Sequence, residues 1–173
     1  MPYPTWQAGQ RITADLLLGG STFNAEQGSD QTVTNSTTLA DSNLVVPAEA
    51  NARYEYTLQA IYSTNTTGKI KFQWSVPNGS MMVRSGHGLG NGQTGGATVG
   101  TLVWSSRGDF STVFNVGGTT GSPPGDASFL EVGEIVTGST AGNVTLQFAQ
   151  AAANATDPAI LRSLSRLRWR RIG

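Results

Sequence analysis

The most constraining feature of the sequence is a strict two-residue alternation of apolar and polar side chains. Apolar residues recur at every second position from Ala52 to Tyr62, and again from Ile70 to Val76. Because successive side chains of a β-strand point to opposite faces, this period predicts two half-buried strands. The turn-forming residues 65–68 lie between them and predict that the two strands pair as a hairpin.

Shorter runs rich in β-forming residues, separated by Gly, Asn and Pro, predict further strands. These runs are Thr32–Thr38, Leu44–Val46, Met81–Arg84, Thr98–Trp104, Ser111–Val116, Phe129–Thr137 and Val144–Gln150. Such frequent short strands predict an all-β fold, an antiparallel β-sandwich or jelly roll. The composition agrees, because 22 Gly, 21 Thr, 16 Ser and 10 Asn favour strands and turns over helices.

The length of 173 residues is typical of one domain with a short extension. We predict an extended N-terminal arm over residues 1–30 and the β-sandwich over residues 31–173. Within the arm, Thr13 is a candidate cap for a short helix or turn that Gly19-Gly20 would end. The arm cannot bury its own apolar residues, so we expect it to pack on its own domain or on a neighbouring copy.

The C-terminal residues allow two interpretations. Asp157-Pro158, followed by apolar residues at helical spacing, is typical of a basic amphipathic helix over residues 158–172. A period of two over residues 163–172 predicts a last strand instead. In both cases five of the eleven basic residues lie in the last twelve positions, namely Arg162, Arg166, Arg168, Arg170 and Arg171.

Charge and residue content exclude several classes of function. Eleven Lys and Arg balance eleven Asp and Glu, so we expect no nucleic-acid binding driven by overall charge. The absence of cysteine excludes disulfides, thiol nucleophiles and Cys-ligated metals, and we expect neither a metal nor a cofactor. The longest aliphatic runs have three residues, so no membrane insertion is expected. The N-terminus also lacks the features of a secretion signal.

Two groups of residues were considered for catalysis. His87 could act as a general base beside Ser85 or Asp109, but a solvated histidine in a glycine-rich surface loop is the favoured interpretation. Glu131 and Glu134 could form a paired-carboxylate site, yet a spacing of three places them on opposite faces of a strand. We expect both to be solvated, and we predict a protein that is not an enzyme.

Two other groups of side chains could bind a partner. Tyr54, Tyr56, Tyr62, Phe72, Trp74 and Trp104 could form a sugar-binding face, but their position on alternating strands favours the core. The C-terminal arginines could bind phosphate groups, protect an edge strand or contact another copy of the chain. We favour a structural or intersubunit role and predict Arg166, Arg168 and Arg170 as subunit contacts.

The order of several segments resembles a known kind of protein. The segments are Trp6–Leu17, Asp30–Leu39, Asn43–Ala48, Tyr54–Tyr56, Phe72–Gly79 and Gly142–Gln150. Together they resemble small virion structural proteins of actinobacterial tailed phages and prophages, of the minor tail, fibre-like or capsid-decoration type. In proteins of this kind the segment that follows the Ala149-Gln150 pair usually ends in a strand with Arg or Lys near the terminus. We therefore favour the strand over the helix at residues 163–172.

The resemblance implies a β-sandwich or jelly roll that assembles, often as a trimer, on the outside of the phage particle, with no catalytic residues to transfer. The expected function is capsid decoration or reinforcement by a homotrimer made in the host cytoplasm. Its expected partners are the major capsid protein or tail proteins. Residues predicted to anchor it to the virion are Tyr3, Trp6, Ile12, Leu16 and Leu17.

Two alternative functions follow from the loops. A tail-associated receptor-binding or carbohydrate-binding module would use residues 85–97 and 117–127 to contact a host surface glycan. A hydrolase that uses His87 is the third hypothesis.

Overall fold

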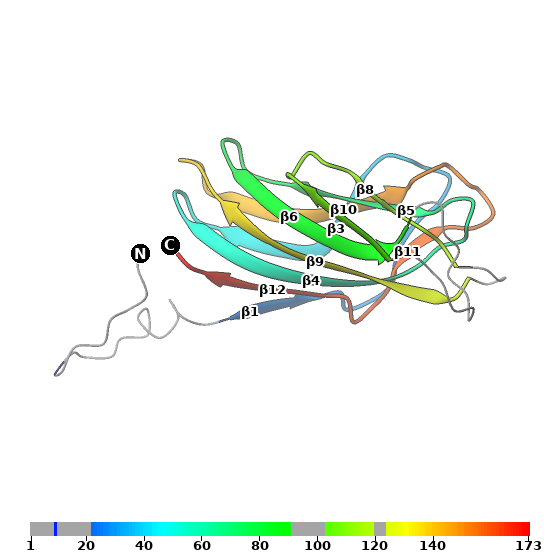
Figure 1. Ribbon diagram of the computed structural model, residues 1–173, viewed down its shortest axis with the longest axis horizontal. Helices are drawn as coiled ribbons and strands as arrows, with labels where there is room; N and C mark the ends of the chain where they lie inside the picture. Colours follow the sequence, from blue (N-terminus) through cyan, green and yellow to red (C-terminus); the bar gives the residue numbers. More distant parts are fainter. Residues whose placement is uncertain (1–8, 10–21, 91–102, 120–123) are drawn as a thin grey trace.

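The computed structural model describes residue 9 and residues 22–90, 103–119 and 124–173. These residues contain twelve strands and no helix, arranged in two sheets whose neighbouring strands run antiparallel (Figure 1). The two sheets pack face to face around one core. The prediction of an all-β antiparallel sandwich is therefore confirmed.

The larger sheet follows the order β1-β12-β4-β9-β6-β7, and β11 pairs with both β2 and β4. Its strands are β1 (Phe23–Glu26), β2 (Gln31–Val33), β4 (Arg53–Ser63), β6 (Met81–Leu89), β7 (Val103–Gly108), β9 (Asp126–Val136), β11 (Ala159–Leu161) and β12 (Arg166–Arg171). The smaller sheet has the order β3 (Ala40–Ala48), β10 (Gly142–Gln150), β5 (Ile70–Ser75) and β8 (Phe114–Val116). The C-terminal residues form strands, so the helical alternative for residues 158–172 is wrong.

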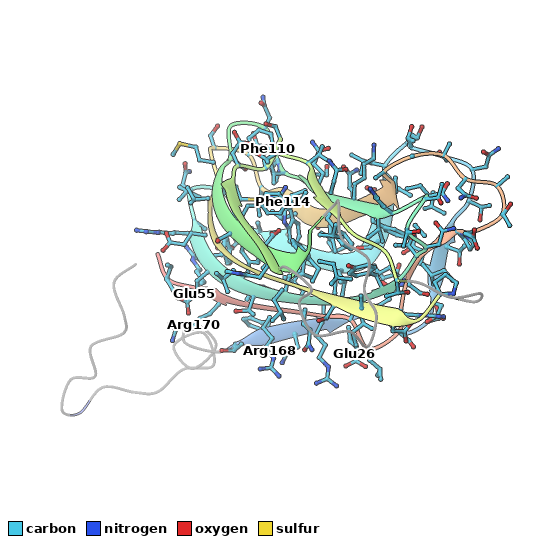
Figure 2. All side chains as sticks on the ribbon, turned by 45° about the vertical axis from the view of Figure 1, so that its right-hand side comes forward. Glu26, Glu55, Phe110, Phe114, Arg168 and Arg170 are labelled. Atoms are coloured by element: carbon cyan, nitrogen blue, oxygen red, sulfur yellow. The ribbon has the colours of Figure 1, made fainter. Side chains whose placement is uncertain are left out.

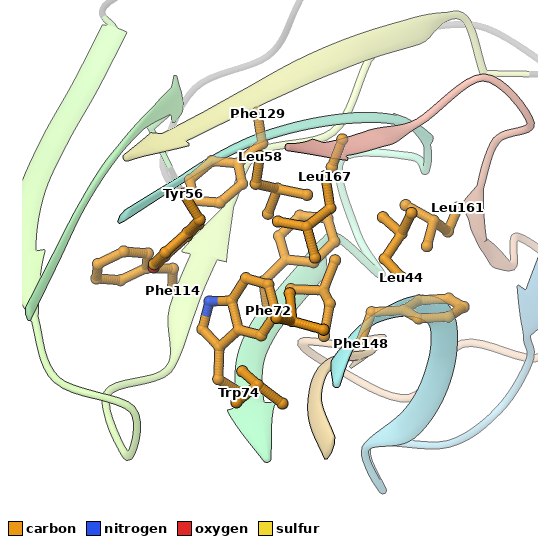
Figure 3. Close-up of a cluster of buried hydrophobic side chains, with 14 of the residues drawn as sticks. Leu44, Tyr56, Leu58, Phe72, Trp74, Phe114, Phe129, Phe148, Leu161 and Leu167 are labelled. Carbon is orange, nitrogen blue, oxygen red and sulfur yellow. The ribbon is translucent and has the colours of Figure 1, made fainter. Parts of the chain in front are cut away.

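The core lies between the sheets and is dominated by aromatic rings (Figure 3). Pairs of rings join one sheet to the other. Tyr56 of the larger sheet meets Trp74 of the smaller one edge to face at 5.2 Å, and Phe72 stacks on Phe129 at 5.1 Å. Offset-stacked and edge-to-face rings add to the stabilisation that burial of their area provides. The five predicted core aromatics whose side chains are described are buried, which confirms that prediction; the side chain of Trp104 lies outside the description.

The predicted hairpin between β4 and β5 is wrong, because the two strands lie in different sheets. β4 pairs with β9, β11 and β12, whereas β5 pairs with β10 and β8. Asn65 organises the connection, since its Oδ1 accepts hydrogen bonds from the backbone N–H groups of Thr67 and Gly68 at 2.9 and 2.7 Å. Each of the two strands buries one face that carries aromatic side chains. These two faces pack against each other across the core.

The prediction of a mobile loop over residues 85–97 is wrong for its first part. Residues 85–89 belong to β6, which pairs with β9 and β7; residues 91–97 lie outside the described residues. The glycines in this strand accommodate a neighbouring ring. A Cβ added to Gly86 would lie 2.6 and 2.7 Å from ring atoms of Phe129 and 2.9 Å from Phe114. Gly86 is therefore a packing residue.

Part of the predicted N-terminal arm is built into the larger sheet. Residues 23–26 form β1, whose register with β12 pairs Phe23 with Trp169 and Glu26 with Arg166. The rings of Phe23 and Trp169 stack at 5.9 Å. Of the remaining arm, residues 1–8 and 10–21 lie outside the description, and so does the predicted turn at Thr13. The division at residue 30 stays a prediction.

Arg162 ties three distant segments of the larger sheet together. Its Nη1 donates to Asp30 Oδ2 at 2.7 Å and its Nε to Asp126 Oδ1 at 2.8 Å. Asp30 Oδ1 also accepts the backbone N–H of Ser163 at 2.8 Å. The Ser163 N–H and the Arg162 guanidinium hold the pKa of Asp30 below its usual value of 3.8. This cluster fixes the entry to β2, the start of β9 and the turn before β12.

We expect Gly86→Ala to destabilise the protein by roughly 1–3 kcal/mol, because the new methyl group overlaps the Phe129 ring. Urea unfolding would measure the change. The control is Gly28→Ala, where a Cβ meets nothing within 4 Å and little change is expected. Equal midpoints for the two variants would contradict the packing role of Gly86.

We expect Asp30→Asn to lower stability only where wild-type Asp30 is ionised. A carboxyl with a lowered folded-state pKa stabilises above its unfolded value of 3.8, and this stability is lost as the pH falls through the folded-state pKa. The difference between wild type and variant in urea unfolding should therefore be constant near neutral pH and shrink below pH 3.8. A difference that persists unchanged in acid would contradict this account.

Candidate functional site

A charged group lies at the centre of the core. The inner face of β9 carries Glu131, whose side chain is fully buried, and Glu134 lies on the outer face of the same strand. The predicted separation of the two carboxylates to opposite faces is confirmed. The expectation that Glu131 is solvated is wrong, because Arg84 on β6 is buried with it and pairs with it.

Every polar atom of the Glu131 carboxylate has a donor. Tyr56 Oη and Trp74 Nε1 donate to Oε1 at 2.7 and 2.6 Å, and Arg84 Nη1 donates to Oε2 at 2.9 Å. The rest of the Arg84 guanidinium donates to the backbone carbonyls of Asp109, at 2.9 Å, and Thr112. Its Cζ also lies 4.0 Å from the centre of the Phe114 ring.

The geometry makes this network structural. Burial raises the pKa of the Glu131 carboxyl, while Arg84 and the two other donors act in the opposite direction. Burial also raises the pKa of Tyr56. The side chains of Arg84 and Glu131 have no exposed surface. A buried pair of this kind is costly to break, since its loss leaves an unpaired charge in the core.

The outer face of the larger sheet is a different surface. Side chains from β12, β4, β9 and β6 line up across it in three rows. The rows are Arg170–Glu55–Glu134–Val83, Arg168–Thr57–Val132–Ser85 and Arg166–Gln59–Leu130–His87. The three arginines that the sequence predicts as subunit contacts therefore share one face.

Four large apolar side chains are exposed on this face. Met81 is 66% exposed, Val83 50%, Leu130 47% and Val132 51%. They come from the adjacent strands β6 and β9, and Val83 and Val132 are diagonal neighbours in the register. Contiguous exposed apolar surface of this kind is typical of an interaction site.

The charged side chains lie beside the apolar ones. Arg170 pairs with Glu55 at 2.6 Å, Arg166 with Glu26 at 3.4 Å, and Arg53 with Glu134. Figure 2 shows Glu26, Glu55, Arg168 and Arg170 on the same side of the molecule, opposite Phe110 and Phe114.

An open groove of about 830 Å³ crosses this face between β12 and β6. Arg168 and Arg170 line it on one side, Val83 and Ser85 on the other, and Val132 lies between them. Thr22, the residue before β1, lines it as well. We take the outer face around this groove as the candidate functional site and call it the β6-β9-β12 face.

The remaining candidate residues do not form a site in the part of the chain that the structure describes. His87 lies on the outer face of β6, and neither Ser85 nor Asp109 bonds to it. Asp109 Oδ1 accepts hydrogen bonds from the hydroxyls of Ser111 and Thr112 at 2.8 and 3.0 Å. Within the 117–127 segment, residues 117–119 are buried and residues 120–123 are outside the description.

The predicted anchoring residues Tyr3, Trp6, Ile12, Leu16 and Leu17 also lie outside the described residues. Among the described ranges, no cluster of acidic and histidine side chains could hold a metal ion. No helix within those ranges has the length and apolarity of a membrane span.

Sequence reasoning missed the exposed apolar residues of the β6-β9-β12 face. Leu130 and Val132 lie at even-numbered positions of β9, whereas the buried Phe129 and Ile135 lie at odd-numbered positions. Apolar residues at both odd and even positions indicate a strand with two apolar faces. The pattern does not tell whether the second face is covered within the chain or by a partner.

No protein-family model matches the chain, and no curated protein matches it. Solved structures of infectious bursal disease virus show a weak likeness. The Gt strain structure has 8% identity and a TM-score of 0.20, over 89% of this chain and 38% of that chain. The VP2 subviral particle has 11% identity and a TM-score of 0.22, over 100% and 42%. The chain spans less than half the length of those chains, and likeness at these scores carries no argument about function.

We expect Arg84→Met to destabilise the fold by about 3–5 kcal/mol, because it leaves the Glu131 carboxylate buried without a cation. Urea unfolding of the variant would measure the loss. The double variant Arg84→Met/Glu131→Gln removes both charges, keeps an acceptor oxygen for Tyr56 and Trp74, and should recover much of the loss. A double variant that is no more stable than the single one would contradict the role assigned to the pair.

Proposed function

We propose that the chain is a noncatalytic structural protein of a virion, which associates with other copies through the β6-β9-β12 face. The observation that carries the proposal is the exposure of Met81, Val83, Leu130 and Val132 on one sheet face. Neighbouring exposed apolar side chains on one sheet face favour an interaction surface, and apolar contact is the main driving force of protein association. The sequence resemblance to phage virion proteins is the reason for proposing a virion as the assembly.

The finer form of the proposal is decoration of the exterior of a tailed-phage capsid by a homotrimer. The predicted arm would attach the trimer to the major capsid protein through Tyr3, Trp6, Ile12, Leu16 and Leu17. Arg166, Arg168 and Arg170 would lie at the contacts between subunits. Among the described residues the one buried ion pair, Arg84–Glu131, has no exposed surface. This agrees with a noncatalytic role.

We expect Val132→Asp to weaken self-association at least tenfold, because it places a carboxylate in the middle of the apolar contact. The residue is half exposed, so the free energy of unfolding should change by no more than about 0.5 kcal/mol. Light scattering would give the mass of each variant, and sedimentation with undecorated phage heads would test attachment.

The matched control is Leu164→Asp. Leu164 is 55% exposed but lies in the turn before β12, away from the β6-β9-β12 face, and its positive φ of 68° is tolerated by Asp. A wild-type oligomer that sediments with heads supports decoration, whereas an oligomer that ignores heads supports the tail-associated receptor-binding alternative. A wild-type chain that stays monomeric and does not bind heads contradicts the proposed function.

A further inference from the structure

The groove on the β6-β9-β12 face has the shape and chemistry of a receptor for a short peptide segment. Val132 and Val83 supply apolar surface, and Thr57 and Ser85 lie beside Val132 in the same row. Arg168 closes the row from β12. The groove therefore combines an apolar floor with the guanidinium of Arg168 along one side. The two carboxylates that also line it, Glu55 and Glu134, are paired with Arg170 and Arg53.

Arg168 has no carboxylate partner among the described residues, unlike its two neighbours on β12. The carboxylates are all engaged elsewhere. They bond to arginines, to amide or hydroxyl groups, or to the buried network, as in Glu26, Asp30, Asp41, Glu49, Glu55, Asp109, Asp126, Glu131, Glu134 and Asp157. The one further acidic residue of the sequence is Asp15.

Asp15 is followed directly by Leu16, Leu17 and Leu18. A carboxylate next to three large apolar side chains matches a groove that offers a guanidinium next to two valines. The segment also ends only four residues before Thr22, which itself lines the groove. Proximity and complementarity thus point to the same short segment.

The direction of β1 separates that segment from the groove of its own subunit. Because β1 runs antiparallel to β12, the chain before Phe23 heads past Arg170 toward the end of the sheet and away from Arg168. The direction of β1 therefore favours the groove of a neighbouring copy over that of its own subunit. Continued outward, the seven residues from Asp15 to Ser21 can span up to about 25 Å, so the segment reaches a neighbouring copy that packs against this end of the sheet.

We propose that the groove of each subunit binds residues Asp15–Leu18 of a neighbouring copy, with the Asp15 carboxylate on the Arg168 guanidinium. The proposal rests on the proposed function and names the partner of its surface. The contact is head to tail, so it closes into a ring when the rotation between subunits permits, as in a trimer. Leu16 and Leu17 then contact the neighbouring copy, so attachment to the particle falls to Tyr3, Trp6 and Ile12 of the predicted arm.

The lack of native cysteine makes a cross-linking test direct. The full-length Leu17→Cys/Ser85→Cys variant is treated with a short bismaleimide at a concentration where the wild type is oligomeric. We expect covalent species up to the size of the closed oligomer, formed only when both cysteines are present. The matched control is Leu17→Cys/Gln73→Cys, since Gln73 lies on β5 in the other sheet.

The other outcomes overturn the proposal. A product that keeps the monomer mass shows that the segment binds its own subunit. Absence of a product beyond that of the single-cysteine variants, or an equal yield from the Gln73 control, shows that the segment does not occupy the groove.

A charge exchange provides a second, independent readout. Arg168→Asp should weaken self-association about tenfold, and addition of Asp15→Arg to the same chain should restore it. Lys71→Asp is the control, because Lys71 lies on β5 in the other sheet, away from the β6-β9-β12 face. Failure of Asp15→Arg to restore association overturns the Asp15–Arg168 contact.

The two proposals fail in distinguishable ways. If the wild type is oligomeric and binds heads while the cross-link and the charge exchange both fail, the arm contact is wrong and the proposed function stands. A wild type that is monomeric and does not bind heads overturns both.

Discussion

The ion pair between Arg84 and Glu131 determines how the strands of the larger sheet must pair. Its carboxylate needs donors from β4, β5 and β6 at once, and only one register supplies them. A slip of one residue in β9 would turn Glu131 to the solvent and Val132 to the core, and would leave Arg84 buried without a counter-charge. Gly133 makes the arrangement possible, since a Cβ there would lie 2.6 Å from Tyr56 Oη.

The same register arranges the outer face. Because side chains alternate, the pairing that buries Glu131 also places Val132 beside Ser85 and in line with Thr57 and Arg168. The polar network inside and the apolar surface outside are therefore two sides of one strand arrangement. Variants of the network would alter the outer face through register rather than through direct contact.

The positions of many strands follow from the alternation of side chains along short stretches of sequence. The pairing of those strands depends on contacts between distant segments. The alternation from Ala52 to Tyr62 was sufficient to predict a strand and its buried face, because burial of a sheet face is a local property. Strand partners were not predictable in this way, as the supposed hairpin of β4 and β5 shows. Glu131 was misjudged for the same reason, since its counter-ion Arg84 is 47 residues away in sequence. The three arginines on one face were predictable, because period two in β12 places them there; their acidic partners and the exposed valines were not.

The placement of β12 between β1 and β4 has a consequence for how the chain matures on the ribosome. β1 has no neighbour in the sheet until residues 166–171 have been synthesised, since its hydrogen-bonding partner is β12. A truncated or incompletely translated chain lacks one wall of the groove and the Arg168 guanidinium along it. The groove is therefore complete only in chains that extend through β12 and in which β12 has joined β4.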